Sequence, residues 1–166
     1  MSDCKMQYAE HNGTYVLKLR GDVRVPICTS LEKFIEDHLL NDKRLRAVMI
    51  DLTETDSIDS TALGLLAKIA VALRELNLGK PIILCLSSDI NRILASMGFD
   101  EVFRILQTTA ALRDRLDELP DEVLSEAEVT QCVIDAHRTL MGLSESNQQT
   151  FRSLVDALES EKRHQH

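Results

Sequence analysis

Two adjacent hydroxyl side chains, Ser60 and Thr61, are the groups best placed to do chemistry, because they lie where an acidic segment meets an apolar run. The N–H groups in the first turn of a helix have no acceptor inside the helix, and the helix dipole is positive there, so the position favours a phosphoryl group. A phosphate of about −1.5 to −2 charge would also repel nearby carboxylates and change how this surface meets a partner. Four carboxylates lie close by in the sequence, those of Asp51, Glu54, Asp56 and Asp59. The segment therefore predicts a charge switch.

Composition alone favours a simpler interpretation, in which Ser60 or Thr61 is an ordinary helix N-cap. Asp-Ser-Thr before an apolar run is a frequent start of a helix, and such a cap stabilises the helix by about 1 kcal/mol. A third interpretation is a small enzyme that uses Asp56 and Asp59 as acid and base. It has the weakest support, because nothing in this loop predicts that water is excluded from it. We therefore expect a protein that is not an enzyme.

No other side chains form a catalytic or metal-binding pattern. His38 is predicted to face solvent or to pair with a neighbouring carboxylate, and His137, which precedes Arg138, is predicted to lie on the surface. The cysteines show no CxxC or other ligand spacing, so we expect free thiols in a reducing compartment, and neither a metal nor a cofactor. They are Cys4, Cys28, Cys85 and Cys132.

Size and charge restrict the classes of partner. The chain has 166 residues, which suits one core plus an appendage, and 44% hydrophobic with 28% charged residues is typical of a globular protein. The formal net charge of −8 disfavours nucleic acid and anionic membrane as partners, because both attract Lys and Arg. No apolar run reaches the roughly 20 residues of a membrane span, and the first residues lack a signal-peptide core. We expect a cytoplasmic protein that binds proteins or small molecules.

Alternating strand and helix patterns predict an α/β domain over residues 1–119. Strands are expected where apolar and polar residues alternate or where short apolar runs occur, at 5–10, 15–20, 47–50, 82–86 and 102–106. Helices are expected after capping residues, from Thr29 or Ser30 to about 41, from 60 to just before Gly79, over 88–95, and from Thr108 or Thr109 to about Leu119. Residues 51–59 are expected to form a polar loop. This alternation implies βαβ crossovers, and hence a mixed sheet with helices packed against it.

Beyond Pro120 the pattern becomes helical and predicts an extension over residues 120–166. Ser125 and Glu128 have the spacing of a capping box, Gly142 is expected to end the first helix, and Ser144 is expected to cap a second. Both helices carry apolar stripes that need burial against the domain, each other or a second copy, so we expect this hairpin to dock onto the α/β domain and to contribute to partner choice or to a homodimer. The stripes are Val129, Val133, Ala136 and Leu140, then Phe151, Leu154, Val155 and Leu158.

A combination of motifs in this sequence resembles a known family. Asp59-Ser60-Thr61-Ala62-Leu63-Gly64 is similar to the Asp-Ser-Ser/Thr-Gly/Ala-Leu-Gly motif of STAS domains, specifically the bacterial anti-sigma factor antagonists. The segment Leu17-Lys18-Leu19-Arg20-Gly21-Asp22 resembles the family's apolar strand ending in Gly-Glu/Asp. Residues 81–86, 88–94 and 97–99 resemble its later strand, helix and turn. The resemblance covers about residues 5–119 and gives two parts, a STAS domain at 1–119 and the extension at 120–166.

The resemblance implies a STAS fold, with a mixed central sheet and helices mainly on one face, and a partner switch. In that family the unphosphorylated domain binds an anti-sigma factor, often itself a serine/threonine kinase. Phosphorylation blocks this binding, and a PPM/PP2C-type phosphatase restores it. Carried over to this sequence, the acceptor falls on Thr61, with Ser60 as the alternative. The residues expected to meet the partner are Asp22, Asp56, Ser57, Asp59, Ser60, Thr61 and Leu63.

Two positions depart from the family's usual pattern. Thr61 stands at the assigned acceptor position where Ser is commoner, and Ala62 replaces the more usual Gly, a change that suits a helix interior. The resemblance also allows a second function without a phosphorylation switch, because some STAS domains are constitutive subunits or scaffolds in transport or stress-signalling complexes.

Overall fold

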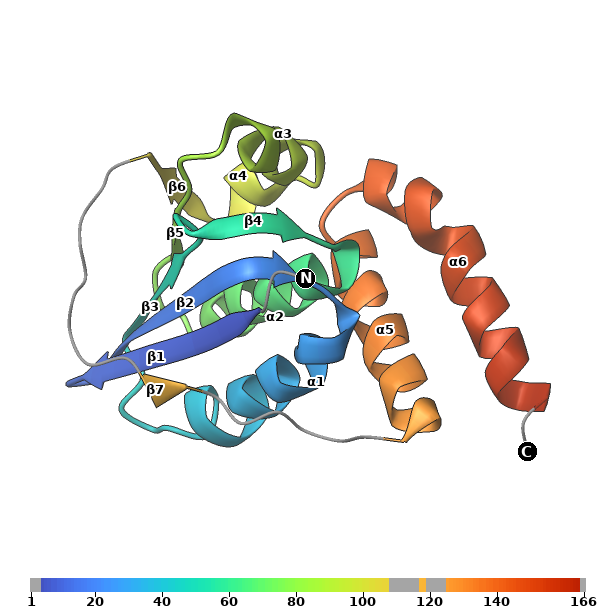
Figure 1. The fold of residues 1–166 in the computed structure, drawn as a ribbon, viewed down its shortest axis with the longest axis horizontal. Coiled ribbons are helices and arrows are strands. Elements are labelled where there is room, and N and C mark those ends of the chain that lie inside the picture. Colours follow the sequence, from blue (N-terminus) through green and yellow to red (C-terminus); the bar gives the residue numbers. More distant parts are fainter. Residues whose placement is uncertain (1–3, 108–116, 119–124, 165–166) are drawn as a thin grey trace.

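A mixed β-sheet forms the centre of the molecule in the computed structural model, which describes residues 4–107, 117–118 and 125–164 (Figure 1). Its strands are β1 (Lys5–His11), β2 (Thr14–Val23), β3 (Ala47–Asp51), β4 (Thr55–Ile58), β5 (Ile82–Leu84), β6 (Arg104–Leu106) and β7 (Asp117–Glu118). The strand order is β6-β5-β3-β2-β1-β7, and β4 pairs with β2 beside this path. β1 is antiparallel to β2 and β7, whereas the β2–β3, β3–β5, β5–β6 and β2–β4 pairs are parallel. The predicted α/β class is confirmed.

The first two strands form a hairpin whose turn is Asn12-Gly13. Both turn residues have positive φ, 51° and 86°, which Asn and Gly tolerate better than other residues and which matches the twist of the flanking strands. Gly13 also lies against the loop before β3, because a Cβ atom there would stand 2.0 Å from the backbone oxygen of Arg44. In β2, alternate side chains at Tyr15, Leu17 and Leu19 are buried, so one face of this strand points into the core.

Four helices and one π-helical turn belong to the α/β part: α1 (Val25–Phe34), η1 (Ile35–Leu39), α2 (Ser60–Glu75), α3 (Ser88–Ser96) and α4 (Phe99–Val102). The predicted cap of the first helix at Thr29 or Ser30 is wrong, because α1 begins at Val25 and both residues are buried inside it. Pro26 stands in the first turn of α1, where its fixed φ favours the helix and its missing N–H has no cost. Ser87 caps α3, with its hydroxyl oxygen accepting from Ile90 N at 3.3 Å.

The predicted polar loop at 51–59 contains a strand, so that prediction is partly wrong. After a register shift between Gly21 and Asp22, the end of β2 turns from β3 to β4 and pairs Asp22 with Ser57. A short pairing of three residue pairs with a distant strand leaves little signal in the local sequence pattern. This pairing positions the start of α2, because β4 leads directly into that helix.

Two predictions near the end of the domain also change. The strand expected from Val102 begins at Arg104, because Phe99–Val102 forms α4 after Gly98, whose φ is +79°. The helix expected from Thr108 or Thr109 to Leu119 lies largely outside the described residues. Within it, Asp117 and Glu118 form β7 on the edge of β1, so the prediction is wrong at these two positions.

The predicted C-terminal hairpin is confirmed as α5 (Glu126–Met141) and α6 (Glu145–His164). Ser125 and Glu128 form the expected capping box, and the Ser144 hydroxyl accepts from Asn147 N at 3.0 Å. α5 packs against α2 and α1, and α6 packs against α5 on the outer side (Figure 1). The side chain of Asn147 in α6 joins the hairpin to the domain by donating to Met97 O at 2.8 Å, and it also donates to Leu140 O of α5 at 2.9 Å. None of the described helices is both long and apolar enough to cross a membrane.

We expect Gly13→Ala to lower the free energy of unfolding by about 2 kcal/mol or more, because a non-glycine residue is strained at this φ and its Cβ meets a backbone oxygen. Gly79→Ala is the matched control, since a Cβ there would meet nothing within 4 Å. Urea denaturation followed by circular dichroism measures both. Equal midpoints for the two variants would contradict the tight approach at Gly13.

Candidate functional site

The carboxylate of Asp59 bridges the starts of two helices. It is the N-cap of α2, where Oδ1 accepts from Ala62 N at 2.9 Å, and its Oδ2 accepts from Val25 N at 2.8 Å at the start of α1. Arg24, the N-cap residue of α1, makes no side-chain cap of its own. The interpretation of Ser60 or Thr61 as the N-cap is therefore wrong, because Asp59 fills that position and serves both helices.

A second contact fixes the strand that leads into α2. The Ser57 hydroxyl donates to Asp22 Oδ1 at 2.6 Å, between β4 and the end of β2. Both side chains are half-buried, whereas Asp56, the residue before Ser57, is exposed. The structure thus brings together Asp22, Ser57 and Asp59, three of the predicted partner-binding residues, but uses their polar groups inside the fold.

Ser60 is hydrogen-bonded to the C-terminal hairpin. Its Oγ lies 2.7 Å from Nε2 of His137 in α5, and Nδ1 of that ring lies 2.6 Å from Val133 O. A carbonyl oxygen can only accept, so Nδ1 carries a proton; in the neutral ring, Nε2 then accepts the proton of the Ser60 hydroxyl. The contact joins residues 77 positions apart and brings the extension onto the predicted switch.

His137 is 2% exposed, so the prediction that it lies on the surface is wrong. A signal was present, because His137 follows Val133 by four positions and so continues the apolar stripe of α5. Its ring also packs edge-on against Phe151 of α6, with centroids 5.1 Å apart. The residue is therefore shared by three elements: α2, α5 and α6.

The hydroxyls of the motif differ in accessibility. Thr61 is 3% exposed and Leu63 is 1% exposed, whereas Ser60 is half-buried. Residues 61–67 of α2 are all buried without a break. A helix that packs on a sheet with its other face in solvent cannot bury seven consecutive residues, so α2 is covered on its outer side as well.

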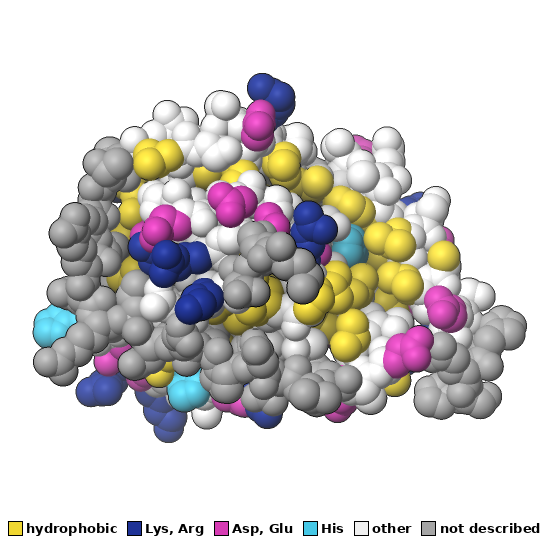
Figure 2. Space-filling view, viewed as in Figure 1, with side chains coloured by type: hydrophobic (Ala, Val, Ile, Leu, Met, Phe, Trp, Pro, Cys, Tyr) yellow, Lys and Arg dark blue, Asp and Glu magenta, His cyan; other side chains and the backbone are white. Residues whose placement is uncertain are grey.

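That cover is α5, which approaches α2 at Gly64. A Cβ atom on Gly64 would stand 2.1 Å from the backbone oxygen of Ala136, and Ala136 is fully buried. Two helices come this close only where small residues face each other. Figure 2 shows hydrophobic side chains gathered along α5 and the adjoining side of α6, where the hairpin meets the domain. The predicted docking of the hairpin onto the domain is therefore confirmed.

The carboxylates of the acidic segment have different surroundings. Asp51 is buried and accepts from both the backbone N–H and the hydroxyl of Thr53, at 2.9 and 2.6 Å. Glu54 pairs with Lys18 and with Arg20, and the hydrogen bond from Lys18 contributes most to holding the pKa of Glu54 below its usual value. Asp56 is exposed on β4, so its side chain is open to a partner.

Two buried cysteine thiols lie where the hairpin meets the domain. Cys132 of α5 is 3% exposed, and burial raises its pKa to about 12, with Glu32 of α1 adding to the shift. Cys28 of α1 is fully buried, and burial followed by the charge of Asp59 raises its pKa further. None of the four cysteines, all of which lie in the described residues, forms a disulfide. Within the described ranges, no group of three or more His, Cys, Asp or Glu side chains could hold a metal ion.

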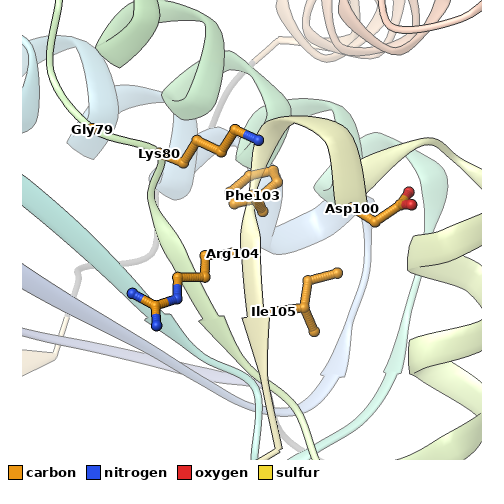
Figure 3. A pocket seen from close by; sticks show the side chains of 6 residues that line it. All are labelled: Gly79, Lys80, Asp100, Phe103, Arg104 and Ile105. Atoms are coloured by element: carbon orange, nitrogen blue, oxygen red, sulfur yellow. The ribbon is translucent and has the colours of Figure 1, made fainter.

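A shallow depression of about 690 Å³ lies at the other end of α2, beyond its last turn. Its charged side chains, Lys80, Asp100 and Arg104, point in different directions rather than to a common point (Figure 3). Gly79, Phe103 and Ile105 complete the lining. It includes none of the predicted site residues and offers no converging polar groups for a small molecule.

Comparison with known proteins identifies the fold of the first two thirds of the chain. Residues 5–112 match the family model described as STAS domain. A structure from Thermotoga maritima, described as a putative anti-sigma factor antagonist, is similar with a TM-score of 0.55 and 20% identity, over 61% of this chain and 85% of that one. A structure of an anti-sigma factor antagonist from Mycobacterium paratuberculosis is similar with a TM-score of 0.52 and 22% identity, over 64% of this chain and 87% of that one. No curated protein sequence matches the chain. At these identities the structures show a shared fold, and the family match ends before α5.

We expect Asp59→Ala to lower the free energy of unfolding by about 2 kcal/mol, because it removes the side-chain acceptor from the first turns of both α1 and α2. Asp56→Ala, three residues earlier and exposed, is the matched control and should stay within about 0.5 kcal/mol of the parent. Both are measured by urea denaturation. Equal stabilities would show that the Asp59 bridge contributes nothing to the fold.

Proposed function

This chain belongs to the STAS domain family, and we propose that it is an anti-sigma factor antagonist controlled by phosphorylation. In this proposal the unmodified chain binds an anti-sigma factor that is also a serine/threonine kinase, and phosphorylation at the start of α2 abolishes binding. A PPM/PP2C-type phosphatase restores the unmodified form. The observation that carries the proposal is the position of Ser60, a partly exposed residue in the first turn of α2 directly after the helix cap.

We propose Ser60 as the acceptor in preference to Thr61, the position assigned from the sequence. A kinase must bring the γ-phosphorus of ATP into contact with the attacking oxygen, and at 3% exposure the Thr61 side chain leaves no path for it. Ser60 lies one position earlier, at the edge of the same motif, and its side chain is only half-buried. Accessibility therefore supports the alternative that the sequence left open.

A phosphate on Ser60 would act mainly on what the surface presents to a partner. It would add about −1.5 to −2 charge beside Asp59 and near the exposed Asp56, in a segment that is already acidic. A partner that recognises the unmodified surface through hydrogen bonds or apolar contact then meets a strong negative potential and a larger side chain. Like-charge juxtaposition of this kind costs several kcal/mol at an interface.

A constitutive interaction subunit is the second candidate function, and one contact favours it. The Ser60 hydroxyl is already engaged by His137, as expected of a hydroxyl that serves a fixed structure. The two candidates differ in whether the chain isolated from its source cells ever carries phosphate.

We expect the chain, incubated with its kinase and ATP, to take up one phosphate at Ser60. Ser60→Ala should abolish uptake, whereas Thr61→Ser, which keeps a hydroxyl of smaller size, should leave it unchanged. Ser60→Ala should also retain the anti-sigma factor, while Ser60→Glu should weaken binding by about tenfold or more, which corresponds to about 1.4 kcal/mol. Phosphopeptide mapping and calorimetry measure the two effects.

Three results would contradict this scheme. Phosphate mapped to residue 61 would reverse the choice of acceptor. Full binding by Ser60→Glu would remove the switch, as would an absence of phosphate on the chain in every growth state, and both would leave the constitutive subunit as the function.

A further inference from the structure

We propose that the C-terminal hairpin, α5 and α6, is a gate. In the unmodified chain it covers the docking face of α2, and phosphorylation of Ser60 holds it open. This inference rests on the proposed function and adds a regulator to it. The gate is the segment Glu126–His164, which lies beyond the part that matches the STAS family model.

The first step of the argument is that the gate and the modified atom touch. The distance between Ser60 Oγ and His137 Nε2 is 2.7 Å, an ordinary hydrogen bond, and His137 is 2% exposed. In the docked position the hydroxyl proton points at an imidazole nitrogen rather than at solvent. A kinase that removes this proton as the oxygen attacks therefore competes with His137 for the hydroxyl.

The second step is that the product of phosphorylation cannot fit under the docked gate. Transfer from a nucleoside triphosphate forms an Oγ–P bond, breaks the bond between the γ-phosphorus and its bridging oxygen, releases the diphosphate, and sends the hydroxyl proton to a base of the kinase or to water. The former hydrogen is replaced by a phosphorus atom with three oxygens. A gap of 2.7 Å has no room for that group, so His137 must leave.

The third step is that His137 cannot leave alone. Its ring packs against Phe151 of α6 at a centroid distance of 5.1 Å, and its neighbour Ala136 lies in backbone contact with α2 at Gly64. Closely packed interiors do not deform gradually. Displacement of the His137 ring therefore moves α5 and α6 away from α2 as one unit.

Charge acts in the same direction as shape. The gate, Glu126–His164, contains seven acidic and four basic side chains, a net charge of −3, so a phosphate on Ser60 repels it. On the domain side of the contact between Ser60 and His137, the exposed Asp56 and the capping Asp59 are also negatively charged. Re-docking of the hairpin therefore requires removal of the phosphate.

The face that the gate covers has the properties of a docking face. Residues 61–67 of α2 are buried without a break, and the outer side of this helix carries Gly64, which permits a close backbone approach. Without the hairpin this apolar stretch would be partly in water, where it would favour association with another apolar surface. The kinase and α5 therefore compete for α2, and the unmodified chain alternates between closed and partner-bound forms.

Native cysteines report the position of the gate. Cys132 lies on α5, 3% exposed, with Glu32 of α1 and Lys68 of α2 as its charged neighbours, so it faces the domain. Opening would expose this thiol and restore ordinary reactivity, because the thiolate is the form that reacts. Cys85 is equally buried but lies after β5, where its thiol donates to Ser87 O, and it serves as the internal control.

The test uses the full chain with phosphoserine installed at position 60 during translation, so that it requires no kinase. Labelling by iodoacetamide at pH 8, resolved for each cysteine by peptide mass spectrometry, should be about tenfold faster or more at Cys132 than in the unmodified chain, with Cys85 unchanged. Gly64→Ala should give the same pattern without any added charge, because its Cβ would stand 2.1 Å from Ala136 O. Gly142→Ala is its matched control, since a Cβ there makes only an ordinary contact of 3.4 Å.

An unchanged rate at Cys132 in the phosphoserine protein would overturn the gate, as would an equal acceleration at Cys85, which would indicate global unfolding. Neither measurement involves an anti-sigma factor. Failure of the gate proposal would therefore leave the proposed function standing. Conversely, a chain that never carries phosphate in cells would overturn the proposed function, while the effect of Gly64→Ala on Cys132 could still be measured.

Discussion

The carboxylate of Asp59 is the constraint on which the geometry of the site depends. One side chain accepts from Val25 N and from Ala62 N, and these N–H groups belong to first turns that have no acceptors inside their own helices. Because both bonds end on the same carboxylate, the starts of α1 and α2 are held together at the end of β4. The position of Ser60 follows from this bridge, since Ser60 is the next residue along the chain. The most distinctive acidic residue of the motif thus has a structural role, and the hydroxyl beside it is left for interaction.

The position of α2 explains why an extension is needed. One side of this helix supplies the domain core, with Leu63, Leu66 and Ile69 buried. Its other side is also apolar and includes Gly64, and α5 covers it at backbone distance. A sequence that is apolar around the whole helix is stable only when both sides are covered. In this chain the second cover is supplied from within, which separates α2 from solvent and brings His137 to the motif.

Local signals predicted much of this fold, whereas tertiary contacts account for what they missed. The residue patterns at 5–10 and 15–20 predicted β1 and β2, the Ser125 and Glu128 pair predicted the start of α5, and the Asp-Ser-Thr motif predicted where α2 begins. Each of these depends on backbone groups within a few residues. The missed features depend on partners far away in the sequence. β4 pairs with β2 only because β2 shifts register after Gly21. The choice of Asp59 rather than Ser60 as the cap depends on Val25 N of α1, which donates to the second carboxylate oxygen of Asp59. The burial of His137 was visible in part from its spacing to Val133, but its hydrogen bond to Ser60 depends on the crossing of α2 and α5.

A gate of this kind sets a threshold for the partner rather than a simple block. A partner can bind α2 only in the fraction of molecules whose hairpin is open, so the apparent dissociation constant equals the intrinsic one divided by that fraction. A closed form favoured about 100-fold therefore weakens binding about 100-fold. Phosphorylation would remove this competition but place charge on the exposed face, so the modified chain would be open and still unable to bind. Removal of the phosphate would then leave the hairpin and the partner to compete again for the same helix. The strength of the docking at Gly64 and His137 therefore determines how much active partner is needed before the chain responds.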